Sequence, residues 1–124
     1  MMSGIGGKNT KPALLVFSYL LKQGIYFQKH YSKVLGCPDV AVPSKKLAVF
    51  IDGDFWHAKG YPKCLKRLRP FWKNKLTSNY LRDKRSRRIL ARSGWKIVRV
   101  WESDLKLDPE KYLAQCKAHL KGDA

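Results

Sequence analysis

A short apolar run, Leu47 to Ile51, is the feature that most constrains the fold. Polar and turn-forming residues bound it, with Ser44-Lys45-Lys46 before it and Asp52-Gly53-Asp54 after it. A short run without apolar/polar alternation is typical of a strand that is buried on both faces. The sequence therefore predicts a central strand over 47–51 in a sheet that is flanked by helices.

Start and stop signals indicate the other elements. Thr10 is a suitable N-cap for a first helix, and Gly24 is a suitable residue to end it. Gly94 is in the same way suitable to end a second, longer helix. We expect helices at 13–23, 70–93 and 109–120, and further strands at 25–28, 40–42 and 97–101. The order strand, long helix, strand predicts a right-handed crossover between parallel strands, hence an α/β fold with a mixed sheet. No repeat or linker divides the chain, so we expect a single domain over 1–124.

The charge of the chain points to a polyanionic partner. Its 124 residues include 26 Lys and Arg against 9 Asp and Glu, a formal net charge of +17. A hydrophobic content of 44% is enough for a core and excludes a disordered basic tail. Nucleic acid is the commonest partner of so basic a domain, and an acidic membrane surface is the weaker alternative.

No segment predicts insertion into a membrane or secretion. The longest apolar stretch, 13–21, contains Ser18 and is about half of the roughly 20 residues that a bilayer crossing needs. The Gly-rich, polar segment 1–10 lacks the apolar core of a secretory signal. We therefore expect an intracellular protein of the cytoplasm or nucleoid, without a membrane partner.

Several possible metal ligands have no partners at a suitable spacing. Cys37, Cys64 and Cys116 are odd in number, far apart and never in a C-x-x-C pair. This excludes a disulfide framework and a four-thiolate zinc site, and favours reduced thiols. His30 and His119 likewise have no acidic or cysteine cluster beside them.

Acidic residues stand at the ends of two predicted strands. Asp39 opens one strand, Asp52 and Asp54 close another, and His57 follows three residues later. Acids that converge on one edge of a sheet suit a hard cation such as Mg²⁺, which takes few carboxylates and fills its shell with other oxygens. A histidine beside such a metal can deprotonate an attacking water. Taken singly, each acid also fits an ordinary turn.

Asp83 is the one acid in the basic segment 73–92, which holds eight Lys and Arg residues. It lies seven residues after Leu76 and seven before Leu90, on the apolar stripe of the predicted long helix. An inward-facing carboxylate needs a partner. From the residues alone, a structural ion pair and a functional role such as orienting His57 both remain open.

Two aromatic pairs stand out in this basic chain. Phe55 and Trp56 follow the turn after the central strand, and Phe71 and Trp72 open the long helix. Aromatics presented among Lys and Arg can stack on bases or wedge between them. For Phe71 we favour packing in the core, and for the other three both interpretations remain open.

Five motifs, in order and at matching spacings, resemble the very-short-patch repair (Vsr) endonucleases and the related EDxHD homing endonucleases. They are Lys8-Asn9-Thr10-Lys11-Pro12, Gly36-x-Pro38-Asp39, Phe50-Ile51-Asp52-Gly53-Asp54-Phe55-Trp56-His57, Phe71-Trp72-x3-Leu76-x2-Asn79-x2-Arg82-Asp83, and Gly94-Trp95 through Val100-Trp101-Glu102. The match covers a catalytic core of about 2–105, before a last helix at about 109–121. The resemblance implies a restriction-endonuclease-like fold of the PD-(D/E)xK superfamily. It also implies Mg²⁺-dependent cleavage or nicking of double-stranded DNA at a mismatch or a specific site, in a repair system or a mobile element.

The resemblance implies a role for each site residue. Asp39 and the backbone carbonyl of Ile51 would hold the metal, and His57 would be the general base. Asp83 would orient His57. Asp52 stands near the metal, where the repair enzymes commonly carry a second histidine. Catalysis would therefore depend on residues from three of the five motifs.

The expected DNA contacts come from the aromatics and from the basic helix. Phe55, Trp56 and Trp72 match the intercalating aromatics of the family, and Met2 matches a wedge from the N-terminal segment. A basic helix supplies phosphate contacts whose strength falls steeply with salt. The cations expected to bind DNA are Lys73, Arg82, Lys84 and Arg85.

Two departures from the family pattern matter. The family's first-helix glutamate, which contacts water near the metal, falls at Ala13, and a methyl group cannot hold that water. We therefore expect impaired activity, whether the alanine is natural or was introduced to silence cleavage. The second departure concerns the structural zinc of the repair enzymes, whose ligand positions hold Asp54, Lys59, Tyr61 and Ser103. We predict no structural zinc, because these side chains do not supply four zinc ligands.

The leading hypothesis is a Mg²⁺-dependent DNA endonuclease. A catalytically inactive DNA-binding module that recognises a site or lesion is the alternative, and Ala13 is the feature that supports it. A basic RNA-binding protein is a third interpretation, but it leaves the strand-end acids and the inward Asp83 without a role.

Overall fold

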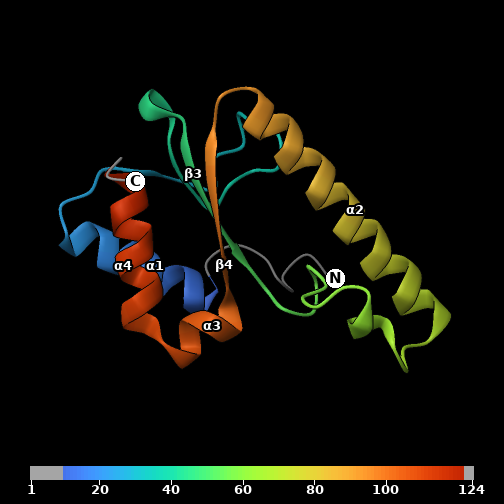
Figure 1. The fold of residues 1–124 in the computed structure, drawn as a ribbon. Helices are drawn as coiled ribbons and strands as arrows, with labels where there is room; N and C mark the ends of the chain where they lie inside the picture. The colour runs from blue at the N-terminus through green and yellow to red at the C-terminus, as the bar shows by residue number, and fades with distance from the viewer. Residues whose placement is uncertain (1–9, 122–124) are drawn as a thin grey trace.

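The computed structural model describes residues 10–121. Four helices and four strands form its main elements (Figure 1). The helices are α1 (Lys11–Lys22), α2 (Pro70–Arg92), α3 (Glu102–Leu107) and α4 (Pro109–Leu120), and the strands are β1 (Gln28–Lys29), β2 (Val40–Val42), β3 (Leu47–Asp52) and β4 (Lys96–Trp101). Short 3₁₀ turns lie at Pro43–Lys45 and Lys63–Leu65. The prediction of an α/β fold is confirmed.

The four strands form one mixed sheet in the order β1-β2-β3-β4. Strand β3 pairs antiparallel with β2 and parallel with β4, with Val49 opposite Val40 on one side and Val98 on the other. The chain passes through α2 between β3 and β4, as the predicted parallel crossover requires. Every residue of β3 is buried, so the central strand predicted from the apolar run is confirmed.

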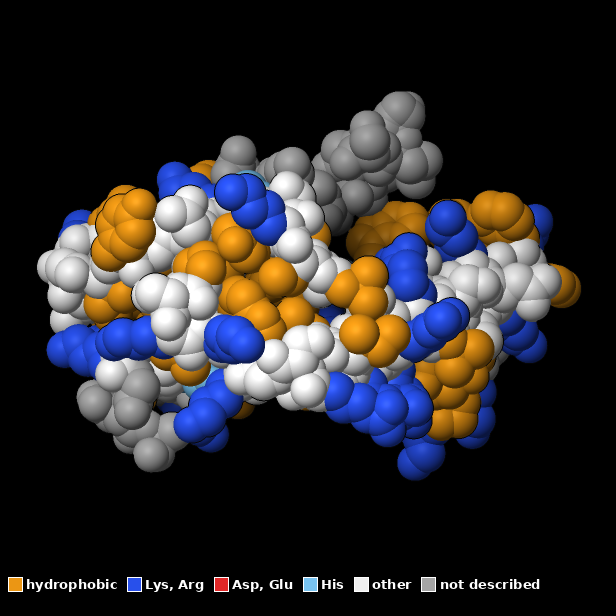
Figure 2. Space-filling model, turned by 90° about the horizontal axis from the view of Figure 1, so that it is seen from above, with side chains coloured by type: hydrophobic (Ala, Val, Ile, Leu, Met, Phe, Trp, Pro, Cys, Tyr) orange, Lys and Arg blue, Asp and Glu red, His pale blue; other side chains and the backbone are white. Residues whose placement is uncertain are grey.

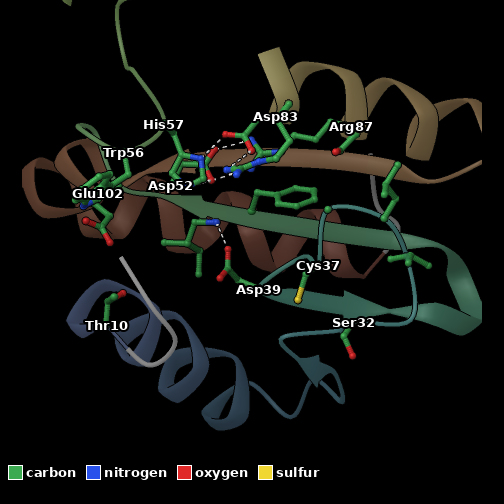
Figure 3. Close-up of a pocket in the computed structure, with 18 of the residues that line it drawn as sticks. Thr10, Ser32, Cys37, Asp39, Asp52, Trp56, His57, Asp83, Arg87 and Glu102 are labelled. Carbon is green, nitrogen blue, oxygen red and sulfur yellow. Dashed lines mark hydrogen bonds and ion pairs between the residues drawn. The ribbon is translucent and has the colours of Figure 1, made fainter. Parts of the chain in front are cut away.

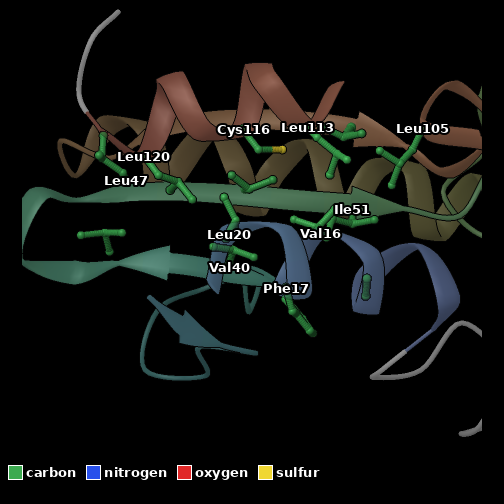
Figure 4. Packing of buried hydrophobic residues seen from close by; sticks show 14 residues of the cluster. Val16, Phe17, Leu20, Val40, Leu47, Ile51, Leu105, Leu113, Cys116 and Leu120 are labelled. Atoms are coloured by element: carbon green, nitrogen blue, oxygen red, sulfur yellow. The ribbon is translucent and has the colours of Figure 1, made fainter. Parts of the chain in front are cut away.

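Helices cover both faces of the sheet (Figure 1). Helices α1 and α4 lie on one face, where Leu47, Val49 and Ile51 enter the main core with residues of both helices (Figure 4). The alternate residues Ala48 and Phe50 point to the opposite face and pack with α2 and its C-terminal turn. Because side chains alternate along a strand, the residue two positions after Phe50 also points toward α2. That residue is Asp52.

The helix ends largely follow the predicted signals. The Thr10 hydroxyl accepts a hydrogen bond from the Ala13 N–H and caps α1. Gly24 and Gly94 follow the ends of α1 and α2 with positive φ, the conformation that glycine adopts without strain. Helix α4 begins at Pro109, with the Asp108 side chain as its cap.

Two differences from the predicted elements have local causes. Strand β1 has only two residues, because Ile25 N–H bonds back to the Leu20 carbonyl and keeps the chain in the helix-ending turn. Helix α3 was not expected, since the apolar pattern of 102–107 is too short to distinguish from a loop. Both segments connect larger elements.

Phe71 corrects another expectation. Its side chain is 66% exposed, so the prediction that it packs in the core is wrong. The first turn of α2 extends beyond the end of the sheet and has no layer to pack against (Figure 1).

The surface of the molecule is strongly basic. The face seen in Figure 2 presents Lys and Arg around apolar groups, with no acidic side chain in view. None of the helices within 10–121 has the length and apolar character needed to span a membrane.

Candidate active site

An open pocket lies where β3 and β4 end, between α2, the start of α1 and the loop that precedes β2 (Figure 3). Its lining brings together residues that are far apart in the sequence. They include Thr10, Asp39, Ile51, Asp52, Trp56, His57, Arg82, Asp83, Arg87 and Glu102. The predicted convergence on one sheet edge is therefore present for Asp39, Asp52 and His57, whereas Asp54 is not among the residues that line the pocket.

His57 and Asp83 form the closest polar pair in the pocket. The Nδ1 atom of His57 lies 2.5 Å from Asp83 Oδ2. Asp83 comes from the inner face of α2, with only 12% of its side chain exposed, so its predicted inward placement is confirmed. Burial acts to raise the pKa of Asp83, but the hydrogen bond and charge of His57, with the charges of Arg87 and Arg82, hold it below its ordinary value. An ionised Asp83 fixes the tautomer with the proton on Nδ1 and leaves Nε2 as the basic nitrogen.

Asp39 is held at the other side of the pocket by the backbone of β3. Strand β2 starts at Val40, so the Ile51 N–H extends past the end of its partner strand. The Asp39 carboxylate takes the place of that partner, and Oδ2 accepts the Ile51 N–H at 2.7 Å. In a strand, the N–H and C=O of one residue point to the same neighbour. The Ile51 carbonyl therefore lies on the Asp39 side of β3.

The position of Asp39 makes its carboxylate costly to ionise. Burial raises its pKa to about 6, although the hydrogen bond from Ile51 opposes this. Ionisation of such a carboxyl group becomes favourable once a divalent cation compensates its negative charge. Among residues 10–121, no three His, Cys, Asp or Glu side chains come together as a ready-made metal site. One carboxylate and one carbonyl suit Mg²⁺, which completes its shell with water and phosphate oxygens.

Two residues near these groups were not anticipated. The Nδ1 atom of His30 lies 3.9 Å from Asp39 Oδ1, an acidic neighbour that the sequence spacing did not indicate. The strand pairing explains this, because His30 follows β1 and its N–H bonds to the Asp39 carbonyl. Glu102 lines the pocket from the end of β4, and its carboxylate faces Thr10 across the opening (Figure 3). A pairing register between strands cannot be read from one sequence.

Asp52 is enclosed by positive charge. Its side chain is 2% exposed and accepts two hydrogen bonds from Arg87, at 2.6 and 2.9 Å. The Nε atom of Arg99 lies 2.8 Å from the same carboxylate. His57 Nε2 is farther away, at 3.7 Å from Asp52 Oδ1. Asp52 is thus primarily the anchor of two arginines.

An aromatic cluster lies beside the pocket. It consists of Phe55, Trp56, Phe71 and Trp72, whose neighbouring rings have centroids 5.1 to 5.8 Å apart. Trp56 also lines the pocket, and its carbonyl accepts a hydrogen bond from Asn79 on α2. The cluster therefore joins the loop after β3 to the start of α2.

The four cations expected to bind DNA are all exposed on α2. They are Lys73, Arg82, Lys84 and Arg85. Met2 lies outside the described residues.

Comparison with known proteins identifies the relatives of the chain. The profile of a family described as DNA mismatch endonuclease Vsr matches residues 1–63. The type II nicking enzyme V.HpaIIP of Haemophilus parainfluenzae is 36% identical over 115 residues, covering 90% of this chain and 82% of the relative. The chain belongs to the Vsr family. Other similar members are the nicking enzyme V.XorIIP of Xanthomonas oryzae pv. oryzae (35% identity, 85% and 79% coverage) and DNA mismatch endonuclease Vsr of Escherichia coli (30%, 85% and 69%).

Ala13 is the point at which this Vsr family member differs most from the expected site. Its methyl group is 3% exposed and packs into the main core with Val16 and Phe17. It is absent from the pocket lining, whereas Thr10, one turn earlier, is part of it. Position 13 therefore contributes no polar group to the pocket.

The positions at which the resemblance places the structural zinc ligands of the repair enzymes hold a polar cluster in this chain. The ammonium group of Lys59 lies 2.7 Å from Ser103 Oγ, 3.1 Å from Asp104 Oδ1 and 3.7 Å from Asp54 Oδ2. The ring of Tyr61 stacks on Tyr80 instead, with centroids 3.9 Å apart. The cluster around Lys59 ties the loop that carries His57 to α3.

Arg87 and Arg99 are two further residues of the site that sequence reasoning missed. Arg87 lies one helical turn after Asp83, and Arg99 is in register with Phe50 across the parallel strands. Both therefore share the face of the sheet from which Asp52 projects. The periodicity that placed Asp83 inward also applied to Arg87, but its charge was grouped with the exposed cations of the helix.

Proposed function

We propose that this chain is a Mg²⁺-dependent DNA endonuclease with a restriction-endonuclease-like fold, which nicks or cleaves a phosphodiester at a mismatch or a specific site. The observation that carries the proposal is the His57–Asp83 pair facing Asp39 and Ile51 across one pocket. Membership of the Vsr family and similarity to nicking enzymes support the same activity.

His57 is the general base in this proposal. With the Nδ1 proton directed at Asp83, Nε2 accepts a proton from water as the water oxygen forms a bond to phosphorus. The bond from phosphorus to one bridging oxygen breaks, and that oxygen leaves with a proton from the solvent. Asp83 then faces an imidazolium ion, whose positive charge its carboxylate stabilises.

Asp39 and the Ile51 carbonyl would hold Mg²⁺. When bound, the ion neutralises charge on the phosphate and makes water a stronger acid. The role of Asp39 is to supply one carboxylate oxygen while its Oδ2 stays fixed by the Ile51 N–H. No zinc is needed, since Lys59 ties together the segments that a structural zinc would join.

The DNA duplex would lie along the aromatic cluster and the exposed basic face of α2. Trp56, which lines the pocket, and its neighbours Phe55 and Trp72 can enter between base steps next to the scissile phosphate. Arg82, at the pocket rim, and Lys73, farther along α2, then contact the backbone. Wedging favours DNA that is already mismatched or easily bent, because less stacking energy is lost.

The proposal is tested by nicking assays on supercoiled plasmid and on mismatch-containing duplex, with Mg²⁺ and with EDTA. The parent chain is compared with Ala13→Glu and with Ala13→Gln, which has the same size without the charge. We expect Mg²⁺-dependent nicking that rises sharply only in Ala13→Glu. Thermal unfolding of all three proteins shows whether the longer side chain disturbs the core around position 13.

A catalytically inactive recognition module is the second candidate. The observation that favours it is the buried methyl group of Ala13, which adds no polar group to the pocket. Binding of DNA by all three proteins without cutting by any of them would establish this candidate and contradict the first.

A further inference from the structure

Arg87 occupies the pocket in a way that exposed DNA-binding cations do not. It projects from the inner face of α2, and only 12% of its side chain is exposed. Its guanidinium carbon lies 3.9 Å from the centroid of the Phe50 ring, and two of its nitrogens bond to Asp52. A guanidinium group held by an aromatic ring and by both oxygens of a carboxylate cannot move freely, so its position in the pocket is fixed before any ligand binds.

The loop before β2 helps to fix this arrangement. Gly36 has a φ of +90°, and a Cβ added there would lie 3.4 Å from the Phe50 ring and 3.7 Å from Ser86. The loop backbone therefore lies directly against the ring that supports Arg87. Phe50, Asp52 and the loop form a rigid seat for the guanidinium group.

Asp52 does not depend on Arg87 alone for its charge partner. Asp52 already has a second cation, because Arg99 Nε lies 2.8 Å from it. One carboxylate thus faces two guanidinium groups, and of these two only Arg87 lines the pocket. A purely structural neutralisation of Asp52 needs one arginine. The second places a positive charge in the pocket beside His57 and Asp83.

Arg87 also retains hydrogen-bond donors. A guanidinium group carries five N–H donors, of which two are directed at Asp52. No other acceptor within residues 10–121 takes the remaining donors. A planar cation with free donors, placed beside His57, suits the non-bridging oxygens of a phosphodiester.

We infer that Arg87 is a further catalytic residue, whose guanidinium group binds a non-bridging oxygen of the phosphodiester that His57 and Asp39 act on, and that Asp52 is its positioning residue. The inference rests on the proposed function. As water attacks, negative charge grows on that oxygen, and a donor that is already fixed stabilises this charge without reorganising. Asp52 thereby serves the reaction without touching metal or substrate.

Arg87→Gln is the decisive variant. Arg99 still neutralises Asp52, so thermal unfolding should confirm a folded protein. We expect single-turnover nicking at saturating DNA to fall by about 10² to 10³-fold, the usual effect of removing one transition-state donor, while DNA affinity changes less than about threefold. Lys22→Gln is the control, because it removes an exposed positive charge from α1, on the opposite face of the sheet from α2. Its nicking rate should equal that of the parent.

A sulfur substitution in the DNA separates catalysis from structure. Replacing one non-bridging oxygen by sulfur should slow nicking by the parent with one of the two diastereomers, and Arg87→Gln should have lost that sensitivity. The measurements are made in the parent and in the Ala13→Glu background. Equal nicking by Arg87→Gln and Lys22→Gln, or an unchanged sulfur effect, would overturn the inference while the proposed function stands. DNA binding without cutting by the parent and by Ala13→Glu would overturn both.

Discussion

The Nδ1 atom of His57 lies 2.5 Å from Asp83 Oδ2, and 26 positions of sequence separate the two residues. His57 comes from the loop after β3, whereas Asp83 is in the middle of α2. Their contact depends on the parallel crossover, which returns the chain along the face of the sheet that Phe50 and Asp52 share. The pocket is therefore a product of topology as much as of local motifs.

The pair leads to a prediction about catalysis. His57→Ala should abolish nicking, because no other histidine of residues 10–121 lines the pocket. Asp83→Asn should slow nicking by about 10² to 10⁴-fold, the range that general acid–base catalysis supplies. Single-turnover nicking and DNA binding should be measured on the same preparations. Equal losses of rate and affinity in His57→Ala would show that the histidine is structural.

Asp39 predicts a pH dependence of stability in the absence of metal. Burial raises its pKa from 3.8 to about 6, so between these values the folded chain binds more protons than the unfolded chain. The contribution of Asp39 to stability is therefore full below about pH 4 and is lost as the pH rises through 6. At about 1.4 kcal/mol per unit of pKa, the loss is at most about 3 kcal/mol.

Asp39→Asn tests this sign. Asparagine keeps an acceptor for the Ile51 N–H but cannot ionise. Denaturant unfolding at pH 4, 5, 6 and 7 in EDTA should show the variant gaining stability relative to the parent across this range. Asp83, whose pKa is lowered, has the opposite sign, because its contribution is lost only as the pH falls below 4. A constant difference between Asp39→Asn and the parent would contradict the prediction.

The aromatic cluster predicts a preference for deformed DNA. Trp56→Ala removes a ring that contacts both Phe55 and Trp72 and lines the pocket. Affinity for mismatched or bent duplex should fall more than affinity for a matched duplex, by roughly 1 to 3 kcal/mol for one lost stacking contact. Titrations with the two duplexes should include Tyr26→Ala, an exposed aromatic outside the cluster. Uniform weakening by Trp56→Ala would indicate simple packing.

Much of this arrangement could be predicted because its signals are periodic. The unbroken apolar run identified β3, and helical spacing placed Asp83 inward although cations surround it in the sequence. Arg87 shares that spacing, but a charge count treats it like Lys84 or Arg85. What distinguishes Arg87 is that the buried carboxylate of Asp52 lies within hydrogen-bond distance of its guanidinium group. That contact depends on the tertiary structure and cannot be read from helical spacing.

Lys59 illustrates the same limit of sequence reasoning and gives the last prediction. Its hydrogen bond to Asp104, its largest electrostatic contact, raises its pKa, so the ammonium group stays charged throughout the working range of pH. This one cation holds Asp54 and Ser103 together, and the Asp54 carboxylate also accepts the Ser103 N–H at 3.1 Å. Loss of the cation should loosen the loop that carries His57.

Lys59→Met keeps much of the side-chain volume and removes the charge. We expect amide hydrogen exchange of segment 54–59 to become about tenfold faster. In the variant the ionic contacts to α3 are missing, so local opening of the segment no longer has to break them. Lys106→Met is the control, since it removes an exposed lysine from α3 itself. Nicking by Lys59→Met should fall in kcat while DNA affinity changes little, because the loop positions the base. Unchanged exchange in segment 54–59 would mean that the Phe55, Trp56 and Trp72 rings alone hold the loop, and that the Lys59 cluster contributes nothing to placing His57.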